Sequence, residues 1–267
     1  MNWSKAKNIL IVLFICADLF LCFVIIMFTG DFERTPAEIT DTAAQIIQKR
    51  GMEIDSALLK TKITSVKIPE LENAAADKDS FAETVLGANY TKNDEGYTSA
   101  KGVLSFGENC FEFVPGADTN LSLMPKTPSV MGRQALAYLG INDKNIICSV
   151  SEKDGNVNLN ITKQADGMRF FCSSIDVLYS KTKILKISGS WYSETGRQSQ
   201  KTQLTPVSSL LIDSAAELNG EKKTVKEIIP GYYIPNGGSN RLFPTPCIKV
   251  IFTDGSELIQ SSAEAAD

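Results

Sequence analysis

Hydrophobic and polar positions divide the chain into one long apolar run and a remainder in which the spacing of apolar residues changes. The run covers residues 8–28, NILIVLFICADLFLCFVIIMF, and Asp18 is its only ionisable side chain. A helix of that length reaches roughly 30 Å, the thickness of the hydrocarbon core of a bilayer. We therefore expect a single transmembrane helix over residues 8–28.

The residues around the run set the expected topology. Lys5 and Lys7 precede it without any acidic residue, so residues 1–7 are expected in the cytoplasm and the rest of the chain outside the cell membrane. A cleaved signal peptide would have a shorter apolar region and a small-x-small exit. A lipoprotein would need a small residue before its acylated cysteine, and neither Cys16 nor Cys22 has one. A buried core helix is the remaining alternative, although such helices are rarely apolar on every face.

Beyond the run, Thr-Pro steps and later glycines mark the starts and ends of helices. Thr at the N-cap, Pro in the first turn and Gly just past the end match the known asymmetry of helix termini. Between these signals apolar residues recur at helical spacing, as at Ile39, Ala43, Ile46 and Ile47. Helices are expected over residues 35–51, 127–140 and 205–220, with a shorter one over residues 79–86.

Between the helices the apolar period changes to two, which is typical of strands. Asp154-Gly155 and Asp254-Gly255 each separate two such segments and predict hairpins. Helices interspersed with hairpins predict an α+β fold with antiparallel sheets. The Pro-rich segment 115–128 predicts a boundary between two extracytoplasmic subdomains, residues 31–120 and 121–267. Strands are expected over residues 59–68, 97–106, 110–114, 146–151, 157–161, 169–179, 184–192, 248–253 and 257–260.

Composition argues against catalysis. At 43% apolar residues the chain can bury a proper core, and it contains no histidine. The absence of histidine excludes Ser-His-Asp and Cys-His catalysis and His-ligated zinc. No phosphate-binding glycine motif occurs either, so we expect no enzyme, no catalytic residues, no metal and no cofactor. The net charge of −4 and the lack of a basic patch give no reason to expect nucleic acid.

The cysteines outside the apolar run leave the disulfide state open. Cys110, Cys148, Cys172 and Cys247 lie in apolar, strand-like segments without a C-x-x-C pair. Four cysteines allow three pairings, and the sequence cannot choose between them. Buried free thiols are the default expectation.

Two features are candidate interaction sites. A carboxylate at the middle of a membrane span costs about 2.5–3.5 kcal/mol, so Asp18 is expected to contact another transmembrane helix, unless it is a tolerated, protonated or snorkelling residue. Trp3 would lie at the cytoplasmic interface. Tyr232 and Tyr233 precede a Gly/Asn-rich loop and offer either a binding surface or packing beneath that loop.

Four segments resemble the YycI family: NWSKAKNILI at residues 2–11, ISGSWY at 187–192, GYYIP at 231–235 and VIFTDGS at 250–256. The resemblance implies a single-pass regulator from Gram-positive bacteria with an α+β ectodomain and no assigned enzymatic activity. It also implies association with a YycH-like protein and with the sensor histidine kinase WalK, which controls cell-wall metabolism.

We therefore expect a membrane-anchored, non-catalytic regulator of a two-component sensor histidine kinase, acting through transmembrane and extracytoplasmic contacts. The alternative is an anchored extracytoplasmic binding module for a cell-wall polymer or peptide. An envelope hydrolase would require a nucleophile that the sequence does not display. Whether regulation activates or inhibits, which signal is read and the oligomeric state all stay open.

Overall fold

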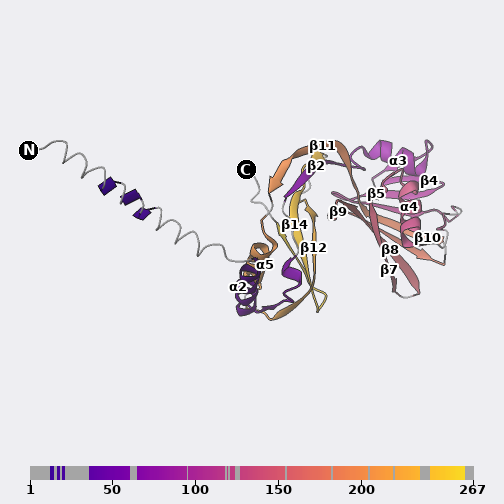
Figure 1. Ribbon diagram of the computed structural model, residues 1–267. Coiled ribbons are helices and arrows are strands. Elements are labelled where there is room, and N and C mark those ends of the chain that lie inside the picture. Colours follow the sequence, from indigo (N-terminus) through magenta and orange to yellow (C-terminus); the bar gives the residue numbers. More distant parts are fainter. Residues whose placement is uncertain are drawn as a thin grey trace, which may run out of the picture.

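The described chain forms two lobes that share one large sheet (Figure 1). The computed structural model describes residues 13–14, 17–18, 20–21, 36–60, 65–94, 96–117, 119, 121–123, 127–153, 155–181, 183–203, 205–218, 220–234 and 241–261.

The helices are α2 (Pro36–Lys49), α3 (Lys78–Leu86), α4 (Pro128–Tyr138) and α5 (Val207–Glu217), with a short 3₁₀ helix at Leu58–Lys60. The strands are β1 (Met52–Glu53), β2 (Ser65–Asn73), β3 (Thr91–Asn93), β4 (Gly96–Ser99), β5 (Gly102–Phe106), β6 (Phe111–Pro115), β7 (Ile146–Lys153), β8 (Asn156–Ala165), β9 (Met168–Ser180), β10 (Lys183–Ser190), β11 (Tyr192–Gln203), β12 (Lys223–Tyr233), β13 (Arg241–Leu242), β14 (Thr245–Phe252) and β15 (Glu257–Ser261).

The expected helices form where the sequence signals place them. At α3 the side chain of Asp77 accepts a hydrogen bond from the amide of Ser80, and Gly87 follows the helix with a φ of 84°. An N-cap carboxylate and a glycine at the C-cap satisfy backbone groups that the helix leaves free. At α4, Pro128 occupies the first turn. At α4 and α5, by contrast, the N-cap residues Thr127 and Pro206 make no side-chain cap hydrogen bond, so the expected threonine caps are not formed there.

The large sheet branches at β9. In the described part of the chain its main path runs β15-β14-β12-β9-β10-β6-β5-β4-β3, while β8 and β7 extend from β9 and β1 pairs with β12. Most pairings are antiparallel, and β9–β12 and β1–β12 are parallel. The sheet is thus mixed rather than purely antiparallel, because β12 reaches β9 from another part of the chain.

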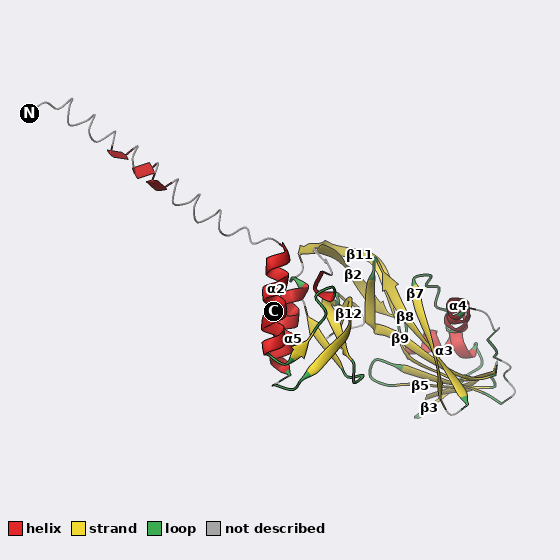
Figure 2. Cartoon of the chain, turned by 60° about the horizontal axis from the view of Figure 1, so that its bottom comes forward, coloured by secondary structure: helices red, strands yellow, loops and turns green. Residues whose placement is uncertain are grey.

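Helices cover one side of the sheet in each lobe (Figure 2). In the α3–α4 lobe, which holds β3–β10, α3 and α4 bury their apolar faces in a cluster with Leu104, Phe113 and Trp191. In the α2–α5 lobe, which holds residues 36–60 and 205–261, α2 and α5 pack on β12 and β14 around a second cluster. That cluster draws from both sides of the boundary expected near residue 120, since it contains Ile47 and Leu211.

The fold class needs one correction. The α+β class is confirmed, but among the described residues no helix is both long and apolar enough to span a membrane. A span needs about 20 consecutive apolar residues. Of residues 8–28 the structure describes only three short helical pieces, in which Asp18 is exposed, and the remainder of the expected transmembrane helix lies outside the described residues.

The two lobes meet where β12 runs beside β9. Only two residue pairs form this parallel contact, Gly231 with Arg169 and Tyr232 with Phe170. A Cβ atom at Gly231 would lie 2.3 Å from the carbonyl oxygen of Arg169 and 2.5 Å from Cε2 of Phe171. Glycine is therefore required here by the close approach of the two strands.

We predict that Gly231→Ala lowers the free energy of unfolding by about 1–3 kcal/mol, because the added methyl group forces the strands apart. Urea denaturation followed by circular dichroism measures the change. Glu227→Ala, at an exposed position of the same strand, is the control and should stay within about 0.5 kcal/mol of the parent. An unchanged midpoint for Gly231→Ala would contradict the close contact.

Candidate functional site

Three cavities in the described part of the chain are large enough to hold a ligand group. The first, of about 370 Å³, lies at the start of β7. The second, of about 280 Å³, lies between β8–β9 and β12–β15. The third, of about 370 Å³, lies beside the ends of α2 and α5. Among the described residues no group of three or more His, Cys, Asp or Glu side chains is placed to hold a metal ion.

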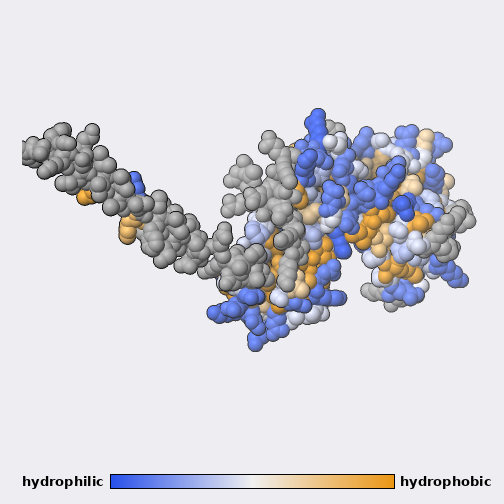
Figure 3. Space-filling model, viewed as in Figure 1, coloured by the Kyte–Doolittle hydropathy of each residue, from blue (hydrophilic) through white to orange (hydrophobic). Residues whose placement is uncertain are grey.

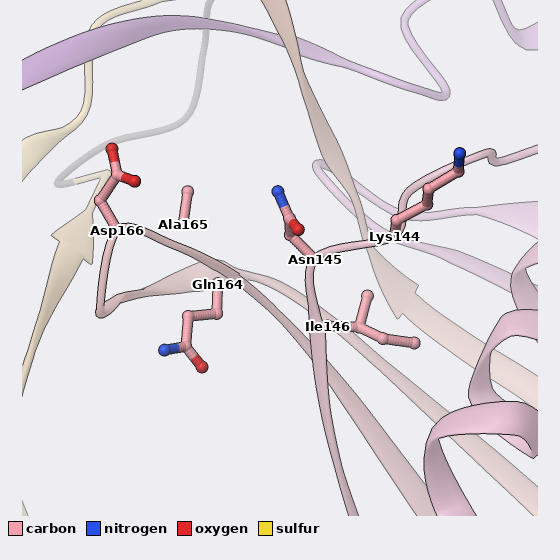
Figure 4. A pocket seen from close by; sticks show the side chains of 6 residues that line it. All are labelled: Lys144, Asn145, Ile146, Gln164, Ala165 and Asp166. Atoms are coloured by element: carbon pink, nitrogen blue, oxygen red, sulfur yellow. The ribbon is translucent and has the colours of Figure 1, made fainter.

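The polar groups that line the first cavity do not converge on one point (Figure 4). Lys144 and Asn145 come from the segment before β7, while Gln164 and Asp166 come from the end of β8 and the turn after it. The Lys144 side chain points away from Asp166, and Gln164 points to the side opposite the Asp166 carboxylate. A site that binds or transforms a ligand needs polar groups that converge, so this cavity is a poor candidate.

The third cavity has a structural explanation. Its basic side chains Lys49, Arg50 and Lys222 lie where α2 and α5 end, and the Nη1 of Arg50 donates to the carbonyl oxygen of Ile212 at 2.8 Å. The Arg50 hydrogen bond ties the end of α2 to the middle of α5, and Lys49 in the last turn of α2 interacts favourably with the free carbonyl groups at that helix end. These contacts explain Lys49 and Arg50 without a ligand.

The second cavity, hereafter the inter-lobe groove, is walled on one side by β8 and β9. Asn160, Thr162 and Ser174 line this wall together with Arg169 and Phe171. The surface in Figure 3 is hollowed between the two lobes. Side chains at alternate positions of a strand share one face, and the opposite face of β8 and β9 packs on the α3–α4 core.

The polar side chains of this wall hold one another in place. The Asn160 Nδ2 donates to Ser174 Oγ at 2.9 Å and to Asp176 Oδ1 at 3.1 Å. The Thr162 hydroxyl donates to Asn160 Oδ1 at 3.0 Å. Asn158 also donates to Asp176, at 3.1 Å. The result is a fixed ladder of amides and hydroxyls on an open sheet face.

The other wall comes from β12, β14 and β15. Lys249 forms an ion pair with Glu257 at 2.7 Å, and its Nζ lies 4.9 Å from the ring centroid of Phe171 across the groove. Ile229 and Ile251 supply apolar surface beside this pair. The cation–π contact therefore links the two walls.

Beneath the groove, a buried charge connects four segments. The Nζ of Lys163 lies 3.0 Å from Asp143, 3.5 Å from Glu194 and 5.3 Å from the ring centroid of Phe170, and its side chain is 4% exposed. It also donates to the carbonyl oxygen of Tyr192 at 3.4 Å. A buried ammonium is tolerated only with such complete pairing.

We predict that Lys163→Met destabilises the fold by about 3 kcal/mol, because it leaves the carboxylate of Asp143, whose side chain is only 16% exposed, without its cation. The double variant Lys163→Met with Asp143→Leu should recover part of that loss. Chemical denaturation measures both changes.

The control for this prediction is Lys92→Met, which removes an ion pair with Asp79 whose side chains are 59% and 60% exposed. An exposed pair contributes less than about 1 kcal/mol. Equal losses for Lys163→Met and Lys92→Met would contradict the special role of the buried lysine.

The tyrosines expected at an interaction surface lie on different sides of β12. Tyr232 is buried against Phe170, with 4.8 Å between ring centroids, and its hydroxyl donates to the carbonyl oxygen of Lys67 at 3.2 Å. Tyr233 is exposed. Tyr232 thus belongs to a third cluster of buried residues, with Leu71 and Met168, that fills the junction of the lobes.

The pH dependence of stability should report this burial. Burial raises the pKa of Tyr232 to about 12, whereas the unfolded chain ionises near pH 10. The stability that the neutral phenol provides is therefore fully present below about pH 10 and is lost as the pH rises towards 12. We predict a smaller loss between pH 10 and 12 for Tyr232→Phe than for the parent, measured by urea denaturation at each pH. Parallel curves for the two proteins would contradict this prediction.

The other described residues singled out in the sequence, Asp18 and the four cysteines, do not line the groove. Asp18 is exposed and Trp3 lies outside the described residues, so neither is brought to the groove. The four cysteines Cys110, Cys148, Cys172 and Cys247 are free thiols as expected, but only Cys247 is buried: Cys148 and Cys172 are partly buried, and Cys110 is exposed. Burial raises the pKa of Cys172 to about 11 and that of Cys247 to about 12.

Sequence reasoning missed the groove residues. Arg169, Phe171 and Lys249 carry no motif, and they meet only because β12 brings β14 beside β9. The one available signal was Gly231 within an apolar segment, since an isolated glycine in a strand often marks a close backbone approach.

Comparisons with known proteins add little. No family model and no curated protein matches the chain. The crystal structure of an uncharacterized protein from Eubacterium rectale is 10% identical with a TM-score of 0.46, covering 85% of this chain and 92% of that one. The C-terminal domain of YpeB from Bacillus megaterium is 12% identical with a TM-score of 0.32, covering 83% of this chain and 92% of that one. TM-scores this low support no conclusion about function.

Proposed function

We propose that this protein is a non-catalytic regulator that binds a segment of a partner protein in the inter-lobe groove. The resemblance to YycI supplies the partner class, a WalK-like sensor histidine kinase that controls cell-wall metabolism, contacted at its outer domain alone or with a YycH-like protein. The observation that carries the proposal is the groove between two lobes that meet in a parallel contact of two residue pairs.

This placement gives a route to regulation. The β8–β9 wall lies over the α3–α4 core, whereas the β14 wall belongs to the α2–α5 cluster. A segment that contacts both walls binds best at one spacing of the lobes. Binding therefore favours the signalling state of the kinase that presents the segment in that geometry, through differential affinity alone.

The groove chemistry supports binding over bond-making. Lys249 is paired with Glu257, and the Ser174 oxygen accepts a hydrogen bond from an amide that is not a base. A serine nucleophile would need a neighbouring general base. The proposal therefore assigns the groove a contact role.

A wall polymer or peptide is the second candidate ligand class. The observation in its favour is the ladder of Asn158, Asn160, Thr162 and Ser174, whose amides and hydroxyls suit a polar ligand.

We predict that the tagged full chain, cross-linked in cells, captures a sensor histidine kinase. Thr162→Lys places a long charged side chain in the groove and should lower kinase recovery about tenfold, a loss of about 1.4 kcal/mol. Quantitative mass spectrometry of the captured proteins measures the recovery. Thr91→Lys, at an exposed position of β3, is the matched control and should recover the kinase as the parent does.

Two outcomes would contradict the proposal. One is capture of no sensor kinase by the parent chain. The other is equal capture by Thr162→Lys. Sedimentation of the full chain with purified wall fragments, in the absence of any kinase, would instead favour the second ligand class.

A further inference from the structure

We infer that the inter-lobe groove binds a carboxylate side chain of an extended acidic peptide segment, with Arg169 as the anchoring cation. The inference deepens the proposed function and rests on it, because it names the chemistry of the segment that the groove would receive. It is carried by the charges, hydrogen bonds and size of the groove.

Among the described residues, one cation of the groove has no ion-pair partner, while the carboxylate of Asp176 on the same wall is held by the amides of Asn158 and Asn160. Lys249 is matched by Glu257 at 2.7 Å, and the nearby buried Lys163 is matched by Asp143 and Glu194. Arg169 is half-buried and lines the groove, and no described carboxylate forms an ion pair with it. One cation is therefore left without its anion.

An arginine in this position is suited to a carboxylate. Its planar guanidinium presents paired N–H donors that match the two oxygens of a carboxylate, and such bidentate pairs are among the strongest hydrogen bonds in proteins. In a groove, where water is partly excluded, the pair is stronger than on an open surface. The unmatched charge of Arg169 is thus complementary to an acidic side chain.

The hydrogen-bond ladder adds a second donor. Both N–H groups of the Asn160 amide are used, on Ser174 and Asp176. Ser174 accepts one of them, and its own hydroxyl proton has no acceptor among the described residues. Ser174 and Arg169 therefore both offer protons to the same cavity, as an anion requires.

The size and floor of the groove favour a peptide. Its volume of about 280 Å³ lies near the lower end of the range for small-molecule sites, which is about 300–1,000 Å³, so it has room for a few side chains. Phe171 and Ile251 supply apolar surface beside the charges. A segment that alternates acidic and aliphatic side chains matches both parts.

The test uses the full chain labelled with ¹⁵N and observes the arginine side-chain N–H signals by NMR. The probes are acetyl-Gly-Glu-Leu-Gly-amide, its glutamine counterpart and inorganic phosphate. We expect saturable shifts of the Arg169 signal with the glutamate peptide and affinity at least about tenfold weaker for the glutamine peptide, which is 1.4 kcal/mol or more.

Matched variants keep the test specific. Arg169→Gln should weaken binding of the glutamate peptide about tenfold. Arg169→Lys should lose about half as much binding free energy as Arg169→Gln, because lysine keeps the charge but lacks the paired N–H donors of the guanidinium. Arg197→Gln removes the same charge from an exposed position of β11 and should bind as the parent does. Equal unfolding midpoints of the variants show that the fold is retained.

The inference is overturned if both peptides bind equally, if Arg169→Gln binds like the parent, or if phosphate binds more tightly than the glutamate peptide. The last result would assign the groove to a phosphate-bearing ligand. A negative result with the peptides would not affect the result of the kinase-capture experiment with the parent chain, so each proposal can be contradicted without the other. Peptide binding without kinase capture would overturn only the proposed function.

Discussion

The close approach of β12 to β9 at Gly231 is the contact on which the rest of the structure depends. It joins two lobes whose hydrophobic clusters are otherwise separate, and it leaves no room for a side chain at that position. The third cluster fills the junction behind it, where the rings of Phe170 and Tyr232 pack against each other at a tilt. The groove exists because the strands meet there and diverge on either side.

Electrostatics reinforces the same junction. Lys163 is buried among partners from the segment before β7, from β9 and from β11, so it fixes these segments against one another. Such a buried cluster adds specificity of arrangement more reliably than it adds stability. Across the groove, Lys249 reaches over the Phe171 ring from the other lobe. The contact of the half-buried Lys249 with Phe171 therefore links the two walls, whereas Lys163 fixes the segments behind the β8–β9 wall.

The sequence was informative wherever local chemistry decides the structure. Thr-Pro starts and glycine ends located α2, α4 and α5, and Asp154-Gly155 located the turn between β7 and β8. It was uninformative at the junction, because the pairing of Gly231 with Arg169 joins segments far apart in the chain and leaves no periodic trace. Tyr232 and Tyr233 show what the sequence could not predict. They are neighbours in the chain, but Tyr232 is buried at the junction and Tyr233 is exposed. For the apolar run, the described residues include no helix long and apolar enough to span a membrane, and most of residues 8–28 lie outside the described part of the chain.

The central claim is that a partner segment lies between the two walls, and site-specific photocrosslinking tests it most directly. A photoreactive amino acid is placed at Thr162 on one wall, at Ile251 on the other, and at the exposed Val103 of the α3–α4 lobe as the control. The account predicts that the two groove positions capture the same short segment of a sensor histidine kinase and that position 103 captures none of it. Capture of the kinase from position 103 alone, or of unrelated segments from the two walls, would contradict it.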